Sequence, residues 1–131
     1  MNRIALIAVP ALLSACAGTL HAAPDQALTK WTFVSIDGKA PVSDKAELSI
    51  YRDRIGATVG CNGMGGDLEV VPGRLKVGPV VSTQMYCEGL MEQERAVAEL
   101  LGASPAFFIE GNRMAIHSDK HIAELVKKRE D

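Results

Sequence analysis

The stretch from Ile55 to Val77, IGATVGCNGMGGDLEVVPGRLKV, decides the fold class of this chain. It contains short apolar segments rich in β-branched residues or alternating with polar ones, as strands do, at residues 55–59, 67–71 and 74–77. The turn-forming pairs Asn62-Gly63 and Pro72-Gly73 separate these segments. Because the connections are short, successive strands must be antiparallel neighbours, which argues against a parallel nucleotide-binding sheet.

The same strand pattern continues on both sides of this stretch. We predict further strands at residues 31–36, 47–51, 106–110 and 113–117. Gly111-Asn112 is a two-residue hairpin loop between the last two of these strands. For residues 122–126 we favour a strand over a short helix, because Ser118-Asp119-Lys120 is typical of another hairpin loop.

One segment has the period of an amphipathic helix. Its predicted apolar face contains Leu90, Met91, Val97, Ala98 and Leu101. Its predicted solvent face contains Glu92, Gln93, Arg95 and Glu99. The helix should end near Gly102, with Pro105 shortly after it. The fold class is therefore α+β, an antiparallel β-sheet with one amphipathic helix packed against it.

The first residues are typical of an export signal. An uncharged apolar run of about ten residues follows Arg3, too short for a transmembrane helix, which needs roughly 20. Leu13-Ser14-Ala15-Cys16 then resembles the lipobox of bacterial lipoproteins, which predicts lipidation of Cys16. Because Ala17 is not the aspartate that commonly retains lipoproteins at the inner membrane, we expect an outer-membrane anchor facing the periplasm. The alternative is ordinary cleavage after Ala17, which would release a soluble periplasmic protein.

The predicted division of the chain is a signal peptide at residues 1–15, a flexible tether at 16–29 and one folded domain at 30–128. The chain carries 14 Lys and Arg against 16 Asp and Glu. So mild an acidity gives no electrostatic reason to expect nucleic acid as a partner. The expected partners are the membrane, through the Cys16 anchor, and an envelope protein or lipid that the sequence does not identify.

The cysteines also fit export. Once Cys16 is lipidated or removed, Cys61 and Cys87 remain, and an even pair in an oxidising compartment predicts a disulfide. Two buried free thiols are the alternative. A bridge closing a loop of about 26 residues would stabilise the domain by roughly 3.5 kcal/mol in the chain-entropy model.

Sequence patterns that suggest chemistry have simpler structural explanations here. Residues 60–66 are glycine-rich but precede a strand and lack the Lys-Ser or Lys-Thr of a phosphate loop, so we predict a tight turn with a bulge. His117 and His121 flank a turn without a third ligand, so we expect no metal. Ser82 and Thr83 do not resemble a nucleophile elbow. We predict no catalytic residue and no cofactor. The aromatic residues are expected to fill the core rather than to stack a ligand: Trp31, Phe33, Phe107 and Phe108.

The order of motifs resembles a known family. Gly60-Cys61-Asn62-Gly63, Gly66-Asp67-Leu68-Glu69, residues 75–79 (LKVGP) and residues 82–87 (STQMYC), followed by a Glu-rich helix, are similar to the META domain, or HslJ-like, family. The resemblance covers residue 31 to about residue 126. It implies an antiparallel sheet curved toward a partial barrel with one helix against it. It brings no established reaction, cofactor or catalytic residue.

The resemblance and the export signal together predict a noncatalytic envelope module. Members of the family are linked to heat shock, antibiotic tolerance and virulence phenotypes. A curved sheet with one helix can leave an apolar cleft at the helix edge, which we expect to be lined by Met85, Tyr86, Leu90 and Met91. Two alternatives remain, a pilotin-like carrier that holds a lipid or an amphipathic segment in this cleft, and an envelope hydrolase.

Overall fold

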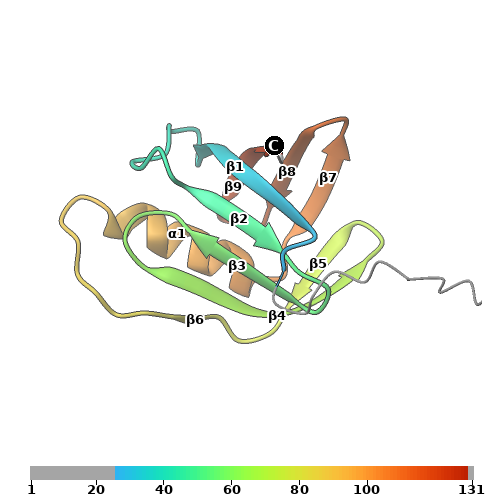
Figure 1. Ribbon diagram of the computed structural model, residues 1–131, viewed down its shortest axis with the longest axis horizontal. Coiled ribbons are helices and arrows are strands. Elements are labelled where there is room, and N and C mark those ends of the chain that lie inside the picture. The colour runs from blue at the N-terminus through green and yellow to red at the C-terminus, as the bar shows by residue number, and fades with distance from the viewer. Residues whose placement is uncertain (1–25, 130–131) are drawn as a thin grey trace, which may run out of the picture.

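The computed structural model describes residues 26–129 (Figure 1). The predicted signal peptide and its lipidation site at Cys16 lie outside the described residues. The elements, in chain order, are β1 (Thr29–Ile36), β2 (Glu47–Ile50), β3 (Arg54–Thr58), β4 (Gly63–Val71), β5 (Arg74–Val77), β6 (Val81–Ser82), α1 (Met91–Gly102), β7 (Ala106–Glu110), β8 (Arg113–His117) and β9 (Ile122–Lys127). The strand preferred for the last element is confirmed. Within residues 26–129, no helix has the length and apolarity needed to cross a bilayer.

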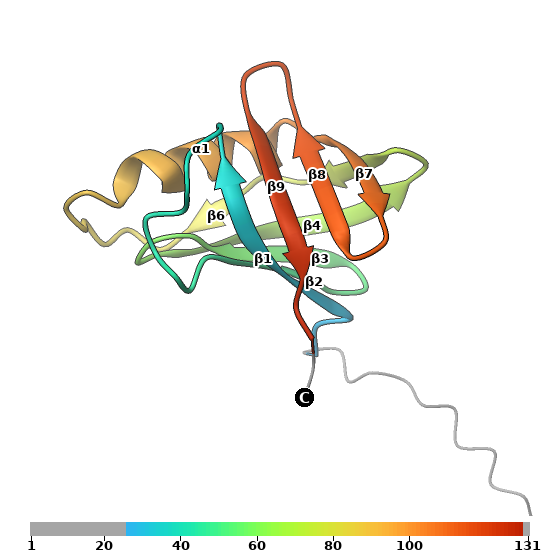
Figure 2. The ribbon, with the colours of Figure 1, turned by 90° about the horizontal axis from the view of Figure 1, so that it is seen from above.

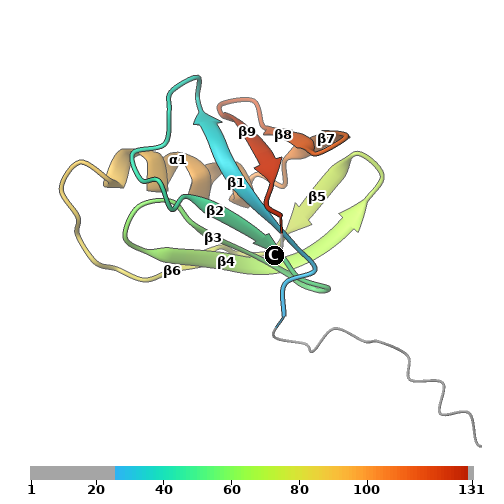
Figure 3. The same ribbon diagram turned by 45° about the horizontal axis from the view of Figure 1, so that its top comes forward.

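The strands form a closed barrel instead of the expected partial one. Eight strands follow one another in the order β3-β2-β1-β9-β8-β7-β5-β4, and β4 pairs with β3 to complete the ring (Figure 3). All of these pairings are antiparallel. Strand β4 makes closure possible because it is long: residues 63–67 pair with β3 and residues 68–71 pair with β5. The β5–β7 contact is the narrowest, with Arg74 opposite Ala106.

The glycine-rich segment, residues 60–66, is only in part the predicted turn. Residues 60–62 lie in the loop between β3 and β4, whereas the rest is strand. Residues 63–66 form the first half of β4, and Gly65 lies opposite Gly56 of β3. A Cβ atom on Gly65 would lie 2.6 Å from the carbonyl oxygen of Ile55, so the two strands approach closely only because this position has no side chain. On its other edge β4 pairs with the short strand β6, which the sequence analysis missed.

The core fills the barrel interior. Trp31 and Phe33 of β1 are buried in it, and Phe107 of β7 is partly buried against it. Phe108 does not belong to the core, because consecutive residues of a strand face opposite sides. It points outward opposite Ala115 and its side chain is 64% exposed. The prediction of four core aromatic residues is therefore wrong for Phe108.

The helix lies over one end of the barrel. Because neighbouring strands alternate in direction, the loops β1–β2, β3–β4 and β8–β9 all occur at the same end. Side chains of α1 hydrogen-bond to each of these loops, and Figure 2 shows the helix at this end, with β1 and β9 pointing in opposite directions beside each other. The buried face of the helix consists of Gln93, Glu94, Ala96, Val97, Leu100 and Leu101.

This face differs from the predicted one, because Gln93 was assigned to solvent and is buried. Its side-chain amide donates to the carbonyl oxygen of Ala40 at 2.9 Å, and its Oε1 accepts from the amide of Val42 at 2.8 Å. The β1–β2 loop therefore supplies the partners that a buried polar side chain requires.

Candidate functional site

A disulfide joins the β3–β4 loop to the segment before the helix. It links Cys61 and Cys87, which are 26 residues apart in sequence, with 6.3 Å between their Cα atoms. Gly60, the residue before Cys61, lies against the start of α1. A Cβ atom there would lie 2.8 Å from the Cβ of Leu90 and 2.9 Å from Glu94 Oε1, so only glycine fits at this distance.

Glu94 of α1 is the centre of the polar contacts behind this disulfide. Its Oε1 accepts hydrogen bonds from the backbone amides of Cys61 and Asn62, both at 2.7 Å. Its Oε2 accepts a third from Asn62 Nδ2 at 2.9 Å. Burial by itself would raise the pKa of Glu94, but the hydrogen bonds from Asn62 and Cys61 outweigh it and hold the pKa below its ordinary value. The side chain is therefore a buried carboxylate, 6% exposed.

Asn62 links this carboxylate to the segment between β6 and α1. Its side chain, 2% exposed, donates from Nδ2 to the carbonyl oxygen of Met85 at 2.7 Å. Its Oδ1 accepts from the amide of Met85 and from the hydroxyl of Thr83, both at 2.9 Å. We call Asn62, Glu94, Thr83 and Met85 the Asn62 network. Every donor and acceptor of the Asn62 side chain is used, which fixes the conformation of the segment that follows β6.

A hollow of about 430 Å³ lies beside this network, at the edge of the helix. We call it the helix-edge hollow. Of the residues predicted to line a cleft there, Met85, Tyr86 and Met91 do so. Leu90 is not among the lining residues, because the helix begins after it and its side chain packs against Gly60. Met64 of β4, which was not predicted from the sequence, also lines the hollow.

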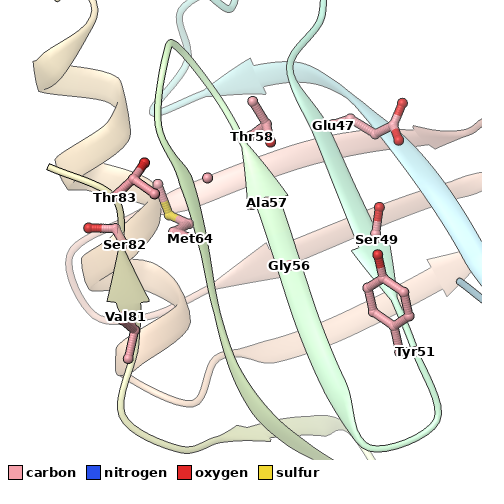
Figure 4. A pocket seen from close by; sticks show the side chains of 11 residues that line it. Glu47, Ser49, Tyr51, Gly56, Ala57, Thr58, Met64, Val81, Ser82 and Thr83 are labelled. Carbon is pink, nitrogen blue, oxygen red and sulfur yellow. The ribbon is translucent and has the colours of Figure 1, made fainter. Parts of the chain in front are cut away.

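A second hollow lies on the outer surface of the barrel, on the other side of β6 (Figure 4). We call this space of about 440 Å³ the outer groove. It runs over β2, β3, β4 and β6, and it is lined by Glu47, Ser49, Tyr51, Gly56, Ala57, Thr58, Gly63, Met64, Val81, Ser82 and Thr83. No groove was predicted here from the sequence.

Glycine and hydroxyl groups give the outer groove its character. Gly56 and Gly63 expose backbone where other residues would place side chains. Hydroxyl groups of Ser49, Tyr51 and Thr58 lie on the β2 and β3 side in Figure 4, and those of Ser82 and Thr83 lie on the β6 side. The guanidinium of Arg54 stacks over the Tyr51 ring, 4.1 Å from the ring centroid, and this cation–π contact restrains the ring. A hydroxyl both donates and accepts, so these walls suit a polar, hydrogen-bonding ligand.

His121 lies outside both hollows, between two carboxylates. Its Nδ1 lies 2.8 Å from Asp37 Oδ2 of the β1–β2 loop, and its Nε2 lies 2.7 Å from Glu99 Oε2 of the helix. The hydrogen bonds to Glu99 and then Asp37 raise the pKa of His121 above its ordinary value of 6.5, against the opposing effect of burial. The imidazolium therefore holds two loops and the helix together. The sequence suggested for His121 only a role as a metal ligand with His117, which was judged improbable.

The part of the chain that the structure describes contains no group of three or more His, Cys, Asp or Glu side chains placed to hold a metal ion. Both ring nitrogens of His121 are bonded to carboxylates, which leaves neither to accept a proton from a serine or threonine hydroxyl. The hydroxyl of Thr83 donates to Asn62. The site thus consists of a rigid polar network with a hollow on each side of β6.

These features define a class of protein: a closed antiparallel barrel, capped at one end by a helix whose polar side chains bind the loops. The sequence profile of the META domain matches residues 25–130, and the chain belongs to the META domain family. No curated protein matches the chain.

Two solved structures share the fold. One protein solved by NMR has 22% sequence identity and a TM-score of 0.68, over 81% of this chain and 95% of its own. A second, from Burkholderia xenovorans and also solved by NMR, has 18% identity and a TM-score of 0.62, over 84% of this chain and 94% of its own. At these identities the likeness concerns the fold alone.

Proposed function

We propose that this META-domain protein is an exported lipoprotein, anchored through Cys16 in the outer membrane, that acts as a noncatalytic binding module of the cell envelope in a stress or antibiotic-tolerance response. The observation that carries the binding role is the outer groove, whose hydroxyl-lined walls and bare glycine backbone suit an extended, polyhydroxylated ligand such as an envelope glycan.

The geometry of the barrel supports an anchor at the amino terminus. Strand β1 begins at Thr29, at the end of the barrel opposite the helix. The proposed anchor would therefore join the domain at the end away from α1. The helix-edge hollow and the β6 side of the outer groove would then face away from the membrane, toward other envelope components.

Processing and acylation test the anchor. Cells expressing the chain should incorporate labelled palmitate into it, and Cys16→Ala should abolish this labelling. Globomycin, which inhibits lipoprotein signal peptidase, should cause the unprocessed form to accumulate. A Cys16→Ala chain that still matures to the normal size and is released as a soluble protein would favour ordinary signal cleavage and contradict the anchor.

Site-specific photocrosslinking in intact cells tests the groove. A photoreactive residue at Thr58, inside the outer groove, should give a discrete crosslinked species. The same residue at Glu69, exposed on the outer side of β4 beyond the groove, is the matched control and should not. Equal crosslinking from both positions would contradict a groove-specific ligand. Crosslinks from Tyr86 but not Thr58 would favour the carrier alternative, because Tyr86 lines the helix-edge hollow.

A groove-filling variant provides an independent test. A Cβ atom on Gly63 meets no other atom within 4 Å, and Gly63 has no positive φ, so Gly63→Leu should fold normally while occupying the groove. It should reduce the Thr58 crosslink at least severalfold. An unchanged crosslink in a folded Gly63→Leu protein would show that the ligand does not use the groove.

A further inference from the structure

Three methionine side chains line the helix-edge hollow. The chain contains five methionines, and Met64, Met85 and Met91 border this one space. They come from three different parts of the fold: strand β4, the segment after β6, and the first turn of α1. Only Met114 of the other two is described, and it lies in the barrel core. Methionines often fill irregular core gaps. Met64 belongs to the buried core and borders the hollow from that side, whereas Met85 and Met91 lie outside the core.

The buried hard donors of the hollow are already engaged. Both carboxylate oxygens of Glu94 accept hydrogen bonds, from Asn62 and Cys61. The Asn62 amide oxygen accepts from Met85 and Thr83. Cys61 and Cys87 are joined in the disulfide and have no thiolate to offer. The thioether sulfurs are therefore the soft donors that remain around this space.

The Asn62 network also holds the backbone of one of these methionines in place. Asn62 bonds both the amide and the carbonyl of Met85, so the backbone that carries this side chain is fixed. The Met91 sulfur accepts a hydrogen bond from the backbone amide of Cys87 at 3.5 Å, which restrains this sulfur beside the segment that precedes the helix. Met64 is 6% exposed, whereas Met85 is 58% exposed. The methionines that line the hollow thus differ in their exposure to solvent.

We propose that the helix-edge hollow binds a soft monovalent cation, Cu(I), with the thioethers of Met64, Met85 and Met91 as its ligands. Thioethers select soft metals over Ca²⁺, Mg²⁺ and Zn²⁺. They also bind without losing a proton, so affinity should not fall between pH 8 and pH 6 as it does at thiolate or imidazole sites. Two charged residues line the hollow, the buried Glu94 and the exposed Arg95. The negative charge of Glu94 offsets the charge of the cation, and solvent screens the positive charge of Arg95. This proposal does not depend on a ligand in the outer groove.

The test uses the full chain carrying Cys16→Ala, so that no free thiol is present once the disulfide has formed. Cu(I) is titrated without oxygen in competition with a chromophoric chelator, and Ag(I) serves as a redox-inert probe for NMR of ¹³C-labelled methionine methyl groups. We expect one cation per chain. The methyl signals of Met64, Met85 and Met91 should shift, while that of Met114 stays in place. Affinity should be the same at pH 6 and pH 8.

Single substitutions assign the ligands. Met64→Leu, Met85→Leu and Met91→Leu should each weaken Cu(I) binding by at least about tenfold, as loss of a metal-site partner does. The matched control is Met114→Leu, which should bind as the parent does. Because Met85 is largely exposed, Met85→Leu keeps the fold and remains informative if the buried Met64→Leu does not fold.

Three results would overturn the proposal. The first is no binding in competition with the chelator. The second is binding that Met85→Leu and Met91→Leu leave unchanged, which would place the cation elsewhere. The third is movement of the methyl signals with a lysophospholipid or an amphipathic peptide but not with Ag(I), which would make the hollow an apolar binding site.

Discussion

Replacing Asn62 by aspartate should destabilise the domain strongly at neutral pH and less strongly in mild acid. Asn62→Asp keeps the shape of the side chain but removes the Nδ2 donor, which serves Met85 at 2.7 Å and Glu94 at 2.9 Å. Losing these two bonds costs about 2–3 kcal/mol. Repulsion between the two carboxylates would add up to about 6 kcal/mol at an effective dielectric constant near 20.

Proton uptake limits this repulsion, so we expect a net loss of about 4–6 kcal/mol at pH 7. The carboxylate pair of the folded variant holds a proton at a higher pH than the unfolded chain does. Its deficit relative to the parent should therefore shrink as the pH falls from 7 to 5. Asn62→Ala loses four side-chain hydrogen bonds, and its deficit of about 4 kcal/mol should be nearly constant over this range. Thr83→Val loses one of them and should cost about 1 kcal/mol.

Urea denaturation at several pH values, followed by the fluorescence of the buried and only tryptophan, Trp31, measures these differences. The pH values used, 5 to 7, stay above the ordinary pKa of Glu94, which is 4.5. The stability that the lowered pKa of Glu94 provides is lost only below pH 4.5 and does not enter the comparison. The titration of His121 is common to parent and variants and cancels in the difference. An Asn62→Asp protein as stable as the parent at pH 7, or one whose deficit does not change with pH, would refute the network as described.

Three further predictions concern other parts of the fold. Gly65→Ala should lower the free energy of unfolding by about 2 kcal/mol or more, because the new Cβ atom meets the backbone of β3. Gly56→Ala, on the paired strand, should change the free energy of unfolding by less than about 0.5 kcal/mol. Equal urea midpoints for the two variants would contradict this difference. The stability that the raised pKa of His121 contributes should be complete below pH 6.5 and should disappear as the pH rises through the pKa of the folded state. His121→Gln should therefore flatten the profile of Tm against pH above pH 6.5. Cys61→Ser and Cys87→Ser should each lower the free energy of unfolding by about 3.5 kcal/mol, and the double variant should lower it no further, since the same disulfide is lost in all three. Additive losses in calorimetry would argue against the disulfide.

The strands that the sequence predicts are those whose apolar side chains alternate or cluster between turn signals. In residues 113–117 the large apolar side chains Met114 and Ile116 stand two positions apart, and β8 occupies the same residues. Residues 63–66 lack this signal because three of the four are glycine, so the first half of β4 was interpreted as a turn. Closure of the barrel was missed for the same reason, since this half of β4 forms the pairing with β3.

The polar network could not be predicted because its partners are far apart in sequence. Periodicity assigns a polar helical residue to solvent, whereas Gln93 and Glu94 point to loops that precede them by between 32 and 53 residues. A weak signal existed: Gln93 precedes the buried Val97 by four positions and so lies in line with the apolar stripe. The carboxylates that hold His121 are 84 and 22 residues away from it. The disulfide followed from the export signal and from the two cysteines that remain once Cys16 is set aside, which requires no knowledge of distance.

The neighbour of the first strand is the last one, since β1 pairs with β9 along most of its length. A polypeptide delivered amino-terminus first, whether from a ribosome or through a translocation pore, cannot form this pairing until residues 122–127 have emerged. Until then one edge of β1 has no strand to pair with. The β1–β9 pairing joins residues far apart in sequence, so it must form late and slowly. The domain can therefore complete its folding only after the whole chain has been synthesised or translocated. Until then the incomplete chain needs protection from aggregation.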